Sequence, residues 1–289
     1  MRQANLSAFE SAAIEFGVYP LSDEIFHRLQ DIVISTTGIQ ITDDKRDLLV
    51  NRLQRRIRKL KLSGFGDYYE LVSQPDSDEF EEFINAVTTN LTSFFREKHH
   101  LEHLAQVALP EISRGALDKR LRVWSAGCSS GEEAYSIAMV IRENAALFPG
   151  WDTRVLATDL DSSVLAQAAQ GCYPENTVAA MNDPHRQEKW FSPVADRLGS
   201  YRVCPSLQEL IRFRKLNLLA EWPFKGRFNA IFCRNVLIYF DKATQKQVVE
   251  HFGRYLTDDG YLYVGHSESL NRVTDMYERV GNTIYRKLR

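Results

Sequence analysis

The chain has 289 residues, of which 44% are hydrophobic, 26% charged and 11% aromatic. At about 150 residues per domain this length suggests two domains, and the composition excludes a mainly disordered protein. No stretch approaches the roughly 18 uncharged apolar residues of a membrane span. Acids at Glu10 and Glu15 interrupt the start, where a signal peptide needs an unbroken apolar run. We therefore expect a cytoplasmic protein without membrane insertion.

The cysteines and histidines give no sign of a metal site. Cys128, Cys172, Cys204 and Cys233 form no CxxC pair, so we expect neither a disulfide nor a zinc site. His99 and His103 are spaced as two ligands on one helix would be, with His100 beside them, but no cysteine or carboxylate follows at a matching spacing. These histidines therefore predict a solvated helix face and no bound metal.

The net charge of −2 hides a basic segment. Residues 45–61 hold eight Lys or Arg and one Asp, which leaves the rest of the chain acidic. The overall charge argues against a general nucleic-acid binder. A basic element on an acidic protein instead suggests a docking surface for an acidic partner.

The first 115 residues show apolar side chains at helical spacing and no strand alternation. The predicted helices span residues 22–35, 42–61, 66–73, 77–88 and 97–113.

After Gly115 short β-rich runs alternate with helical patterns, which predicts a doubly wound, mainly parallel α/β sheet with ligands at the carboxyl ends of its strands. The predicted strands span residues 121–126, 153–159, 228–235 and 260–266, with helices at 132–145, 162–170 and 242–256 and a terminal hairpin that turns near Gly281. Residues 171–209 are too long for a simple connection. Two short strands, SYRVCP and ELIRFR, lie at the end of this stretch, and we interpret it as an inserted lobe.

Two motifs indicate a nucleoside site. In VWSAGCSSGEEAYSIA (123–138) a strand leads through Gly127 and Gly131 into a helix that begins with Glu132 and Glu133. Ser129 breaks the dinucleotide pattern GxGxxG, there is no P-loop lysine, and acids at a helix start disfavour phosphate. A tight structural turn with acids at the favourable dipole end is the alternative.

In ATDLDSSVL (157–165), Asp159 ends the next strand, where an acid can accept hydrogen bonds from ribose hydroxyls. The alternative for an acid here is capping of the next helix, a role that we assign to Asp161. Together, a glycine turn without phosphate-binding groups and an acid placed for ribose hydroxyls indicate a ligand that contains adenosine but no pyrophosphate. S-adenosylmethionine matches this description better than NAD or ATP.

Two further motifs carry polar residues in apolar surroundings. FCRNVLIYFD (232–241) ends the third clear strand and places Arg234, Asn235 and Tyr239 beside the same cleft. The alternative is a structural salt bridge for Arg234 and a core position for Tyr239. TTNLTSFFRE (88–97) joins the helical part to the sheet, and its Arg96 has a guanidinium that can orient a carboxylate.

Together with KLNLL (215–219) and GYLYVGHSESL (260–270), these motifs resemble, in the same order, the CheR family of chemoreceptor glutamate methyltransferases. The resemblance implies a class I, Rossmann-like methyltransferase domain over residues 91–289, with a small β-subdomain inserted at about 171–209. It also implies an all-helical N-terminal domain over residues 1–90 that docks the receptor. The implied reaction uses S-adenosylmethionine to methylate glutamate γ-carboxylates and releases S-adenosylhomocysteine.

The resemblance also implies roles for individual residues. The residues that match the family's cofactor contacts are Asn90, Thr92, Arg96, Glu133, Asp159, Asn217, Leu218, Arg234 and Asn235. Glu132 is the alternative to Glu133. Arg96 and Tyr239 match the residues near the transferred methyl group. A glutamate substrate is already ionised at pH 7, so no general base is required.

The expected partner is the cytoplasmic domain of chemoreceptors. Leu49, Leu53, Ile57 and Leu60 lie on one face of the predicted helix 42–61, and basic residues form a stripe on a neighbouring face: Arg52, Arg55, Arg56 and Lys59. A solvated basic face is the alternative for this stripe, but an acidic receptor helix would complement it. The inserted lobe could also bind a receptor C-terminal peptide. We expect a monomer that binds no nucleic acid.

Two other functions remain open at this stage. A methyltransferase of the same fold could act on another acceptor, and a non-catalytic module could bind S-adenosylmethionine as a signal. An NAD enzyme is disfavoured by Ser129.

Overall fold

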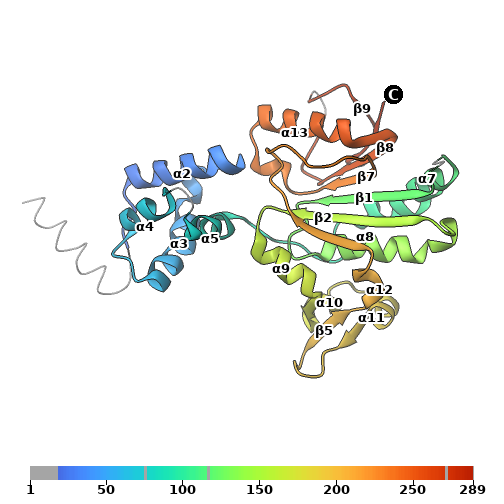
Figure 1. The fold of residues 1–289 in the computed structure, drawn as a ribbon, viewed down its shortest axis with the longest axis horizontal. Helices are drawn as coiled ribbons and strands as arrows, with labels where there is room; N and C mark the ends of the chain where they lie inside the picture. Colours follow the sequence, from blue (N-terminus) through green and yellow to red (C-terminus); the bar gives the residue numbers. More distant parts are fainter. Residues whose placement is uncertain (1–18, 75–76, 116–117, 271–272, 289) are drawn as a thin grey trace, which may run out of the picture. The chain divides into compact units, whose positions relative to one another are not determined.

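The computed structural model describes residues 19–74, 77–115, 118–270 and 273–288 (Figure 1). The chain divides into two compact units, Met1–Thr89 and Asn90–Arg289. We call them the helical unit and the sheet unit. Among the described residues no helix has both the length and the apolar character that crossing a membrane requires.

The helical unit contains four α-helices in its described part, as predicted. They are α2 (Asp23–Thr37), α3 (Arg46–Leu60), α4 (Phe65–Val72) and α5 (Asp78–Val87). The first turn of the predicted helix 42–61 is a separate 3₁₀ turn, η1 (Asp43–Lys45). The apolar faces of these helices meet in a core that includes Phe26, Leu29, Leu53, Ile57, Tyr68 and Phe83.

Local sequence sets the ends of α2. The Ser22 side chain accepts a hydrogen bond from the Ile25 N–H at the first turn, which satisfies one of the unpaired donors of a helix start. The helix ends at Gly38, whose φ of 74° suits glycine.

The sheet unit is built on a seven-stranded mixed sheet with the order β6-β2-β1-β7-β8-β10-β9. Its strands are β1 (Arg120–Ala126), β2 (Asp152–Asp159), β6 (Ile211–Lys215), β7 (Phe228–Cys233), β8 (Leu256–Val264), β9 (Tyr277–Gly281) and β10 (Ile284–Lys287). The strands from β6 to β8 are parallel, and the terminal hairpin adds β10 and β9 in the antiparallel sense. The predicted α/β fold and the hairpin are therefore confirmed.

One strand lies elsewhere than predicted. We placed ELIRFR at the end of the inserted lobe, but β6 pairs in parallel with β2 at the edge of the main sheet. The sequence pattern predicts a strand at this position but does not indicate which strand it pairs with.

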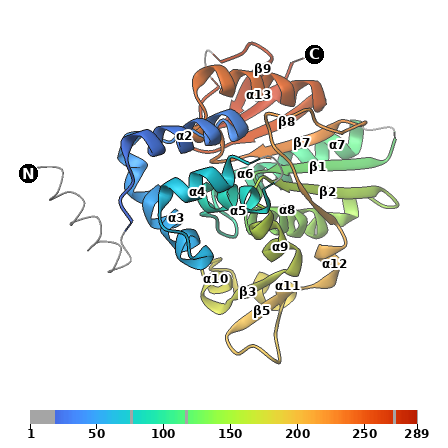
Figure 2. The same ribbon diagram turned by 60° about the vertical axis from the view of Figure 1, so that its left-hand side comes forward.

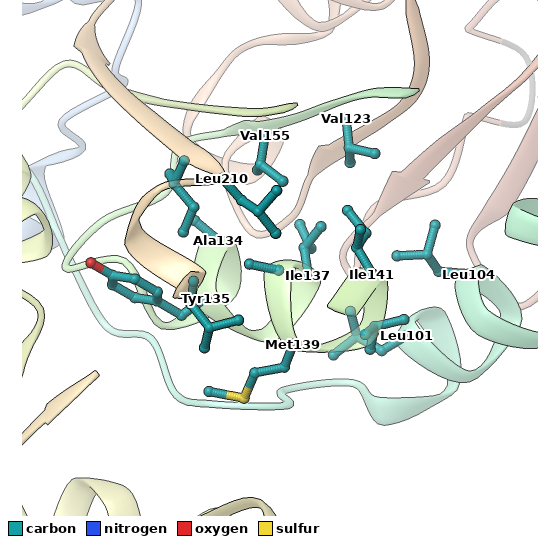
Figure 3. Close-up of a cluster of buried hydrophobic side chains, with 14 of the residues drawn as sticks. Leu101, Leu104, Val123, Ala134, Tyr135, Ile137, Met139, Ile141, Val155 and Leu210 are labelled. Carbon is teal, nitrogen blue, oxygen red and sulfur yellow. The ribbon is translucent and has the colours of Figure 1, made fainter. Parts of the chain in front are cut away.

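Helices cover the main sheet. They are α6 (Lys98–His103), α7 (Leu109–Gly115), α8 (Glu132–Glu143), α9 (Ser162–Gln170), α12 (Pro205–Gln208) and α13 (Lys242–Tyr255), with the 3₁₀ turns η3 (Ala145–Leu147) and η4 (Leu237–Tyr239). Figure 3 shows Ile137 and Ile141 of α8 lying between the strand residues Val123 and Val155 on one side and Leu101 of α6 on the other. A π-helical turn, η2 (Leu104–Ala108), interrupts the predicted helix 97–113 between α6 and α7.

A second sheet lies in the chain between α9 and α12. Its strands are β3 (Cys172–Pro174), β4 (Phe191–Pro193) and β5 (Ser200–Val203), which pair antiparallel in the order β3-β5-β4. Two helices accompany it, α10 (Glu175–Ala179) and α11 (Pro184–Trp190) (Figure 2).

Candidate functional site

The loops that follow β1, β2, β6 and β7 meet at the carboxyl edge of the main sheet. The turn after β1 is tied to β2, because the N–H groups of Gly127 and Cys128 donate to the Thr158 carbonyl at 2.8 and 2.9 Å. The end of β2 is tied to the loop after β6, because the Asp159 carbonyl accepts the Leu216 N–H at 2.9 Å. The sequence-predicted motifs are therefore neighbours in space.

Glycine is required at both ends of the turn after β1. Gly127 has φ of 84°, and a Cβ there would lie 2.4 Å from Cγ2 of Val236, in the loop after β7. Gly131 has φ of 98°, and its Cβ would lie 2.8 Å from Cβ of Ala168 and 2.9 Å from the Tyr173 hydroxyl. Both glycines therefore allow the protein's own segments to pack closely around this turn.

Asp159 is held at the end of β2 with acceptor capacity remaining. Its Oδ2 accepts the Ser129 N–H at 2.8 Å, and its Oδ1 accepts the Asp161 N–H at 3.0 Å. Burial raises the pKa of its carboxyl, and these backbone donors oppose that rise. A carboxylate has about four lone-pair positions, so two such bonds leave room for further donors.

Asp161 has the structural role that we predicted for it. It is the N-cap of α9, where its Oδ1 accepts the N–H groups of Ser163 and Val164 at 2.9 and 3.3 Å. Its other oxygen accepts Nδ2 of Asn90 at 2.7 Å.

Asn90 lies against both loops. Besides its bond to Asp161, its carbonyl accepts the Ser129 hydroxyl at 3.0 Å. The predicted site residue Asn90 therefore lies directly beside the loop that follows Asp159. Thr92, two residues further along the chain, is half-buried.

The two acids at the start of α8 have different partners. Glu132 accepts the Ser130 hydroxyl at 2.7 Å. Glu133 accepts the Ser125 hydroxyl at 2.7 Å and pairs with Nη1 of Arg234 at 3.2 Å. Burial raises the pKa of both carboxyls. Glu133 is therefore already engaged with β1 and with the loop after β7.

Arg234 forms the structural salt bridge that we considered as the alternative to ligand binding. Its side chain is 3% exposed. It donates to Glu133 through Nη1 and to the Arg96 carbonyl through Nη2, and its Nε lies 3.5 Å from Oε2 of Glu97. Arg234 thus joins the loop after β7 to the start of α8 and to residues 96–97.

The remaining predicted residues lie in the segment before α6 and in the loops after β6 and β7. Arg96 is half-buried and donates from Nη1 to the Leu91 carbonyl at 2.9 Å. Asn217 accepts the Leu219 N–H at 2.9 Å, and Leu218 is buried. Tyr239 lies at the end of η4 and is half-buried, so it is not the core residue of the alternative interpretation.

Glu268 was missed by the sequence analysis. Its buried carboxylate accepts the N–H groups of Asn235, Ile238 and Gly265 at 2.9, 3.1 and 2.5 Å. Asn235 has φ of 59°, and a Cβ at Gly265 would lie 2.6 Å from its Nδ2. Glu268 therefore shapes the loop that carries Arg234 and Tyr239. The only sign of this role in the sequence is an acidic residue within the motif HSESL (266–270).

The prediction of a solvated histidine face is wrong. His100 is fully buried, and its Nε2 lies 3.1 Å from the Asn282 carbonyl. His103 is half-buried with Nδ1 at 3.0 Å from the Tyr263 hydroxyl. Burial lowers the pKa of His100 to about 3 and also lowers that of His103. No group of three potential metal ligands occurs among the residues that the structure describes.

The basic stripe of α3 divides into engaged and exposed residues. Arg52 donates to the carbonyls of Val87 and Thr88 at 2.8 and 2.7 Å, at the end of α5. Arg56 binds both oxygens of Glu79 at 2.8 and 2.7 Å. Arg55 and Lys59 are exposed.

The chain is similar to known protein families over nearly its full length. Residues 24–88 match the family model described as CheR methyltransferase, all-alpha domain, and residues 90–286 match CheR methyltransferase, SAM binding domain.

Three relatives are similar over most of their length. A probable chemotaxis protein methyltransferase of Rhizobium etli is 40% identical over 88% of this chain and 96% of its own. A chemotaxis protein methyltransferase of Escherichia coli is 40% identical over 92% and 91%, and chemotaxis protein methyltransferase 2 of Pseudomonas aeruginosa is 38% identical over 91% and 92%.

Proposed function

The chain belongs to the CheR methyltransferase family, and on this premise we propose how its residues serve the reaction. The protein is a chemotaxis protein methyltransferase that uses S-adenosylmethionine to convert glutamate γ-carboxylates of chemoreceptors into methyl esters. The observation that carries our assignment of its site is the meeting of four loops around Asp159 at the carboxyl edge of the sheet.

The electrostatics of these loops fit S-adenosylmethionine. Glu132 and Glu133 are buried and Asp159 is half-buried, and burial raises the pKa of each carboxyl. Glu133 already pairs with Arg234, and a cationic ligand beside Asp159 and Glu132 would offset the cost of keeping these two carboxyls ionised away from water. S-adenosylmethionine carries a sulfonium and an ammonium group, whereas a dinucleotide or ATP would add negative phosphates.

We assign the parts of the cofactor to separate loops. Asp159 holds the ribose hydroxyls, because its two oxygens retain acceptor capacity. Asn217 and Leu218 hold the adenine beside it, since Leu216 is bonded to Asp159. Asn90, Thr92 and Arg96 hold the methionine part, with the Arg96 guanidinium on its carboxylate.

In this proposal Arg234, Asn235 and Glu133 mainly bind other residues of the protein and not the cofactor. Arg234 and Glu133 are buried partners of one another, and Asn235 is fixed through its N–H on Glu268. Their role in this proposal is to hold the loops of Arg96 and Tyr239.

The chemistry requires alignment more than acid–base catalysis. The bound cofactor supplies an electrophilic methyl group. An ionised glutamate attacks it without help from a base, and alignment of two reactants can account for about 7–11 kcal/mol of the barrier. Tyr239 and Arg96 line the place where the two meet, and they would orient the glutamate and exclude water from it.

Receptor docking is assigned to α3. Because Arg52 and Arg56 are held by α5, we assign the steering of an acidic receptor helix to the exposed pair Arg55 and Lys59.

We further propose that a receptor peptide does not add as a strand to the small sheet. The Trp190 carbonyl and the Val194 N–H form hydrogen bonds with the β5 segment. Because these groups alternate along a strand, the backbone N–H and C=O positions of Phe191 and Pro193 point away from β5, toward the open edge of β4. Pro193 has no N–H, and on the opposite edge β3 likewise ends in Pro174. Such short, proline-containing edges resist strand addition.

The function is tested with labelled S-adenosylmethionine and receptor-containing membranes. We expect label on the receptor that base treatment releases as volatile methanol, because a carboxyl methyl ester is base-labile. The same membranes with receptor glutamates changed to alanine are the control. Tight binding of S-adenosylhomocysteine without label on any receptor would contradict the proposed acceptor.

A further inference from the structure

The segment Phe95–Arg96–Glu97 has a strained backbone on both sides of Arg96. Phe95 and Glu97 have φ of 54° and 51°, in the left-handed region that favours glycine. Residues with side chains stay in that region only when their surroundings hold them there. The strain therefore indicates that the position of Arg96 is set by its neighbours.

Each residue of this segment is bonded to a different element. The Phe95 N–H donates to the Ser136 hydroxyl of α8 at 3.0 Å. The Arg96 carbonyl accepts Nη2 of Arg234 from the loop after β7. Glu97 accepts the His266 N–H at 3.1 Å through Oε1, in the loop after β8.

Glu97 also takes part in a buried contact that lacks hydrogen bonds. Among the described side chains, Oε2 of Glu97, Nδ1 of His100 and Nε of Arg234 are buried and have no hydrogen-bond partner. The Glu97 oxygen lies 3.3 Å from the His100 nitrogen and 3.5 Å from the Arg234 nitrogen.

We assign the proton of the His100 ring to Nε2, on the side away from Glu97. The Thr283 hydroxyl donates to the Asn282 carbonyl at 2.8 Å, so both of these oxygens act as acceptors for Nε2 of His100. Burial lowers the pKa of His100 to about 3, so the ring is neutral and Nδ1 presents a lone pair to the Glu97 carboxylate. Two acceptors face each other, which disfavours the folded state.

The charge of Arg234 keeps the carboxylate in this place. Burial alone would raise the pKa of Glu97, but the His266 N–H and the charge of Arg234 outweigh burial and lower that pKa. Glu97 is therefore an ionised group between Arg234 and His266 that tolerates an unfavourable contact with His100.

We propose that Glu97 is a positioning residue for cofactor binding. It holds Arg234 beside the Arg96 carbonyl and so fixes the backbone from which the Arg96 guanidinium reaches the cofactor carboxylate. This inference rests on the proposed role of Arg96.

The substitution Glu97→Gln separates positioning from stability. The new amide can accept the His266 N–H and donate to Nδ1 of His100, and Arg234 keeps Glu133 as an anionic partner, so Tm should change little. The charge facing Arg234 is lost, and we expect the KM for S-adenosylmethionine and the Kd for S-adenosylhomocysteine to rise about tenfold, within the range for a weakened charged hydrogen bond.

The matched control is Glu102→Gln on α6, the helix that follows Glu97, at an exposed residue that pairs only with Lys98 among the described contacts. It should leave Tm, KM and Kd unchanged. Glu97→Asp, which keeps the charge on a shorter side chain, should restore part of the lost affinity. A Glu97→Gln protein with wild-type KM and Kd, or one that fails to fold, would make Glu97 a structural residue and overturn the proposal.

Arg96→Ala distinguishes this proposal from the proposed function. It should weaken binding of S-adenosylhomocysteine more than Glu97→Gln does, and unchanged binding would refute the cofactor role of Arg96 itself. Calorimetry with S-adenosylhomocysteine needs no methyl acceptor. A wild-type protein that binds S-adenosylhomocysteine but methylates no receptor would contradict the proposed acceptor, and the effect of Glu97→Gln on Kd could still be measured.

Discussion

Asp159 and Asp161 are two residues apart, yet their surroundings give them different uses. Asp161 is 1% exposed, and its oxygens are taken by the first turn of α9 and by Asn90. Asp159 accepts the backbone N–H groups of Ser129 and Asp161 on separate oxygens and keeps room for further donors. This difference in remaining acceptor capacity is the reason for our proposal that Asp159, and not Asp161, binds the ribose hydroxyls.

Replacing Asp159 by alanine should therefore weaken the binding of S-adenosylhomocysteine. Loss of a charged acceptor for ribose hydroxyls costs about 1.5–3 kcal/mol, or roughly 10- to 150-fold in Kd. Calorimetry measures the change directly. Asp152→Ala, at the opposite, exposed end of the same strand, is the control and should bind normally. Wild-type affinity of the Asp159→Ala protein would refute the assignment.

The sequence predicted the capping role of Asp161 correctly because that role depends only on the position of a residue at the start of one helix. It did not predict the role of Glu268, whose three N–H donors come from two loops about 30 residues apart. It also misjudged His100, because the burying groups Asn282 and Thr283 are far along the chain.

At the scale of the element, α3 shows that contacts between distant parts of the chain cannot be predicted from local sequence. Its apolar spacing predicted the helix and its buried face correctly, and Leu49, Leu53 and Ile57 are buried. The pattern cannot tell which basic residues are engaged, because the partner of Arg56 is Glu79 on α5. The position of β6 was misjudged for a similar reason, since its neighbour β2 precedes it by more than 50 residues.

The Arg56–Glu79 pair should stabilise the helical unit. Glu79 has a side chain that is 7% exposed, and it also accepts the Tyr68 hydroxyl at 2.9 Å. Glu79→Ala leaves Arg56 without its bidentate partner, and breaking a buried pair in this way costs about 3–5 kcal/mol. Glu82→Ala removes a partner of Arg56 that is 48% exposed and should cost about 1 kcal/mol or less.

Urea denaturation of the full chain can assign this loss to the helical unit. All four tryptophans lie at positions 124–222, so their fluorescence reports the sheet unit, whereas circular dichroism reports the helices of both. We expect Glu79→Ala to move only the circular dichroism transition. Equal shifts in both signals would contradict a stabilising role confined to the helical unit.

At the scale of the whole molecule, the proposed roles are separated along the chain. The residues proposed to bind S-adenosylmethionine and to orient the glutamate lie at 90–239, in the sheet unit, and the residues proposed to dock the receptor lie on α3 of the helical unit. Cofactor affinity and receptor docking should then respond to different substitutions.

Reversing the exposed charges of α3 tests this separation. The double variant Arg55→Glu with Lys59→Glu should lower kcat/KM for the receptor about tenfold at low salt, as expected when two steering charges are reversed, and the loss should shrink at high salt as screening increases. The Kd for S-adenosylhomocysteine should not change. Lys242→Glu with Lys246→Glu provides a control with the same spacing on exposed residues of α13. If the α3 variant and the control methylate receptors equally well at low salt, the acidic receptor helix does not dock on α3.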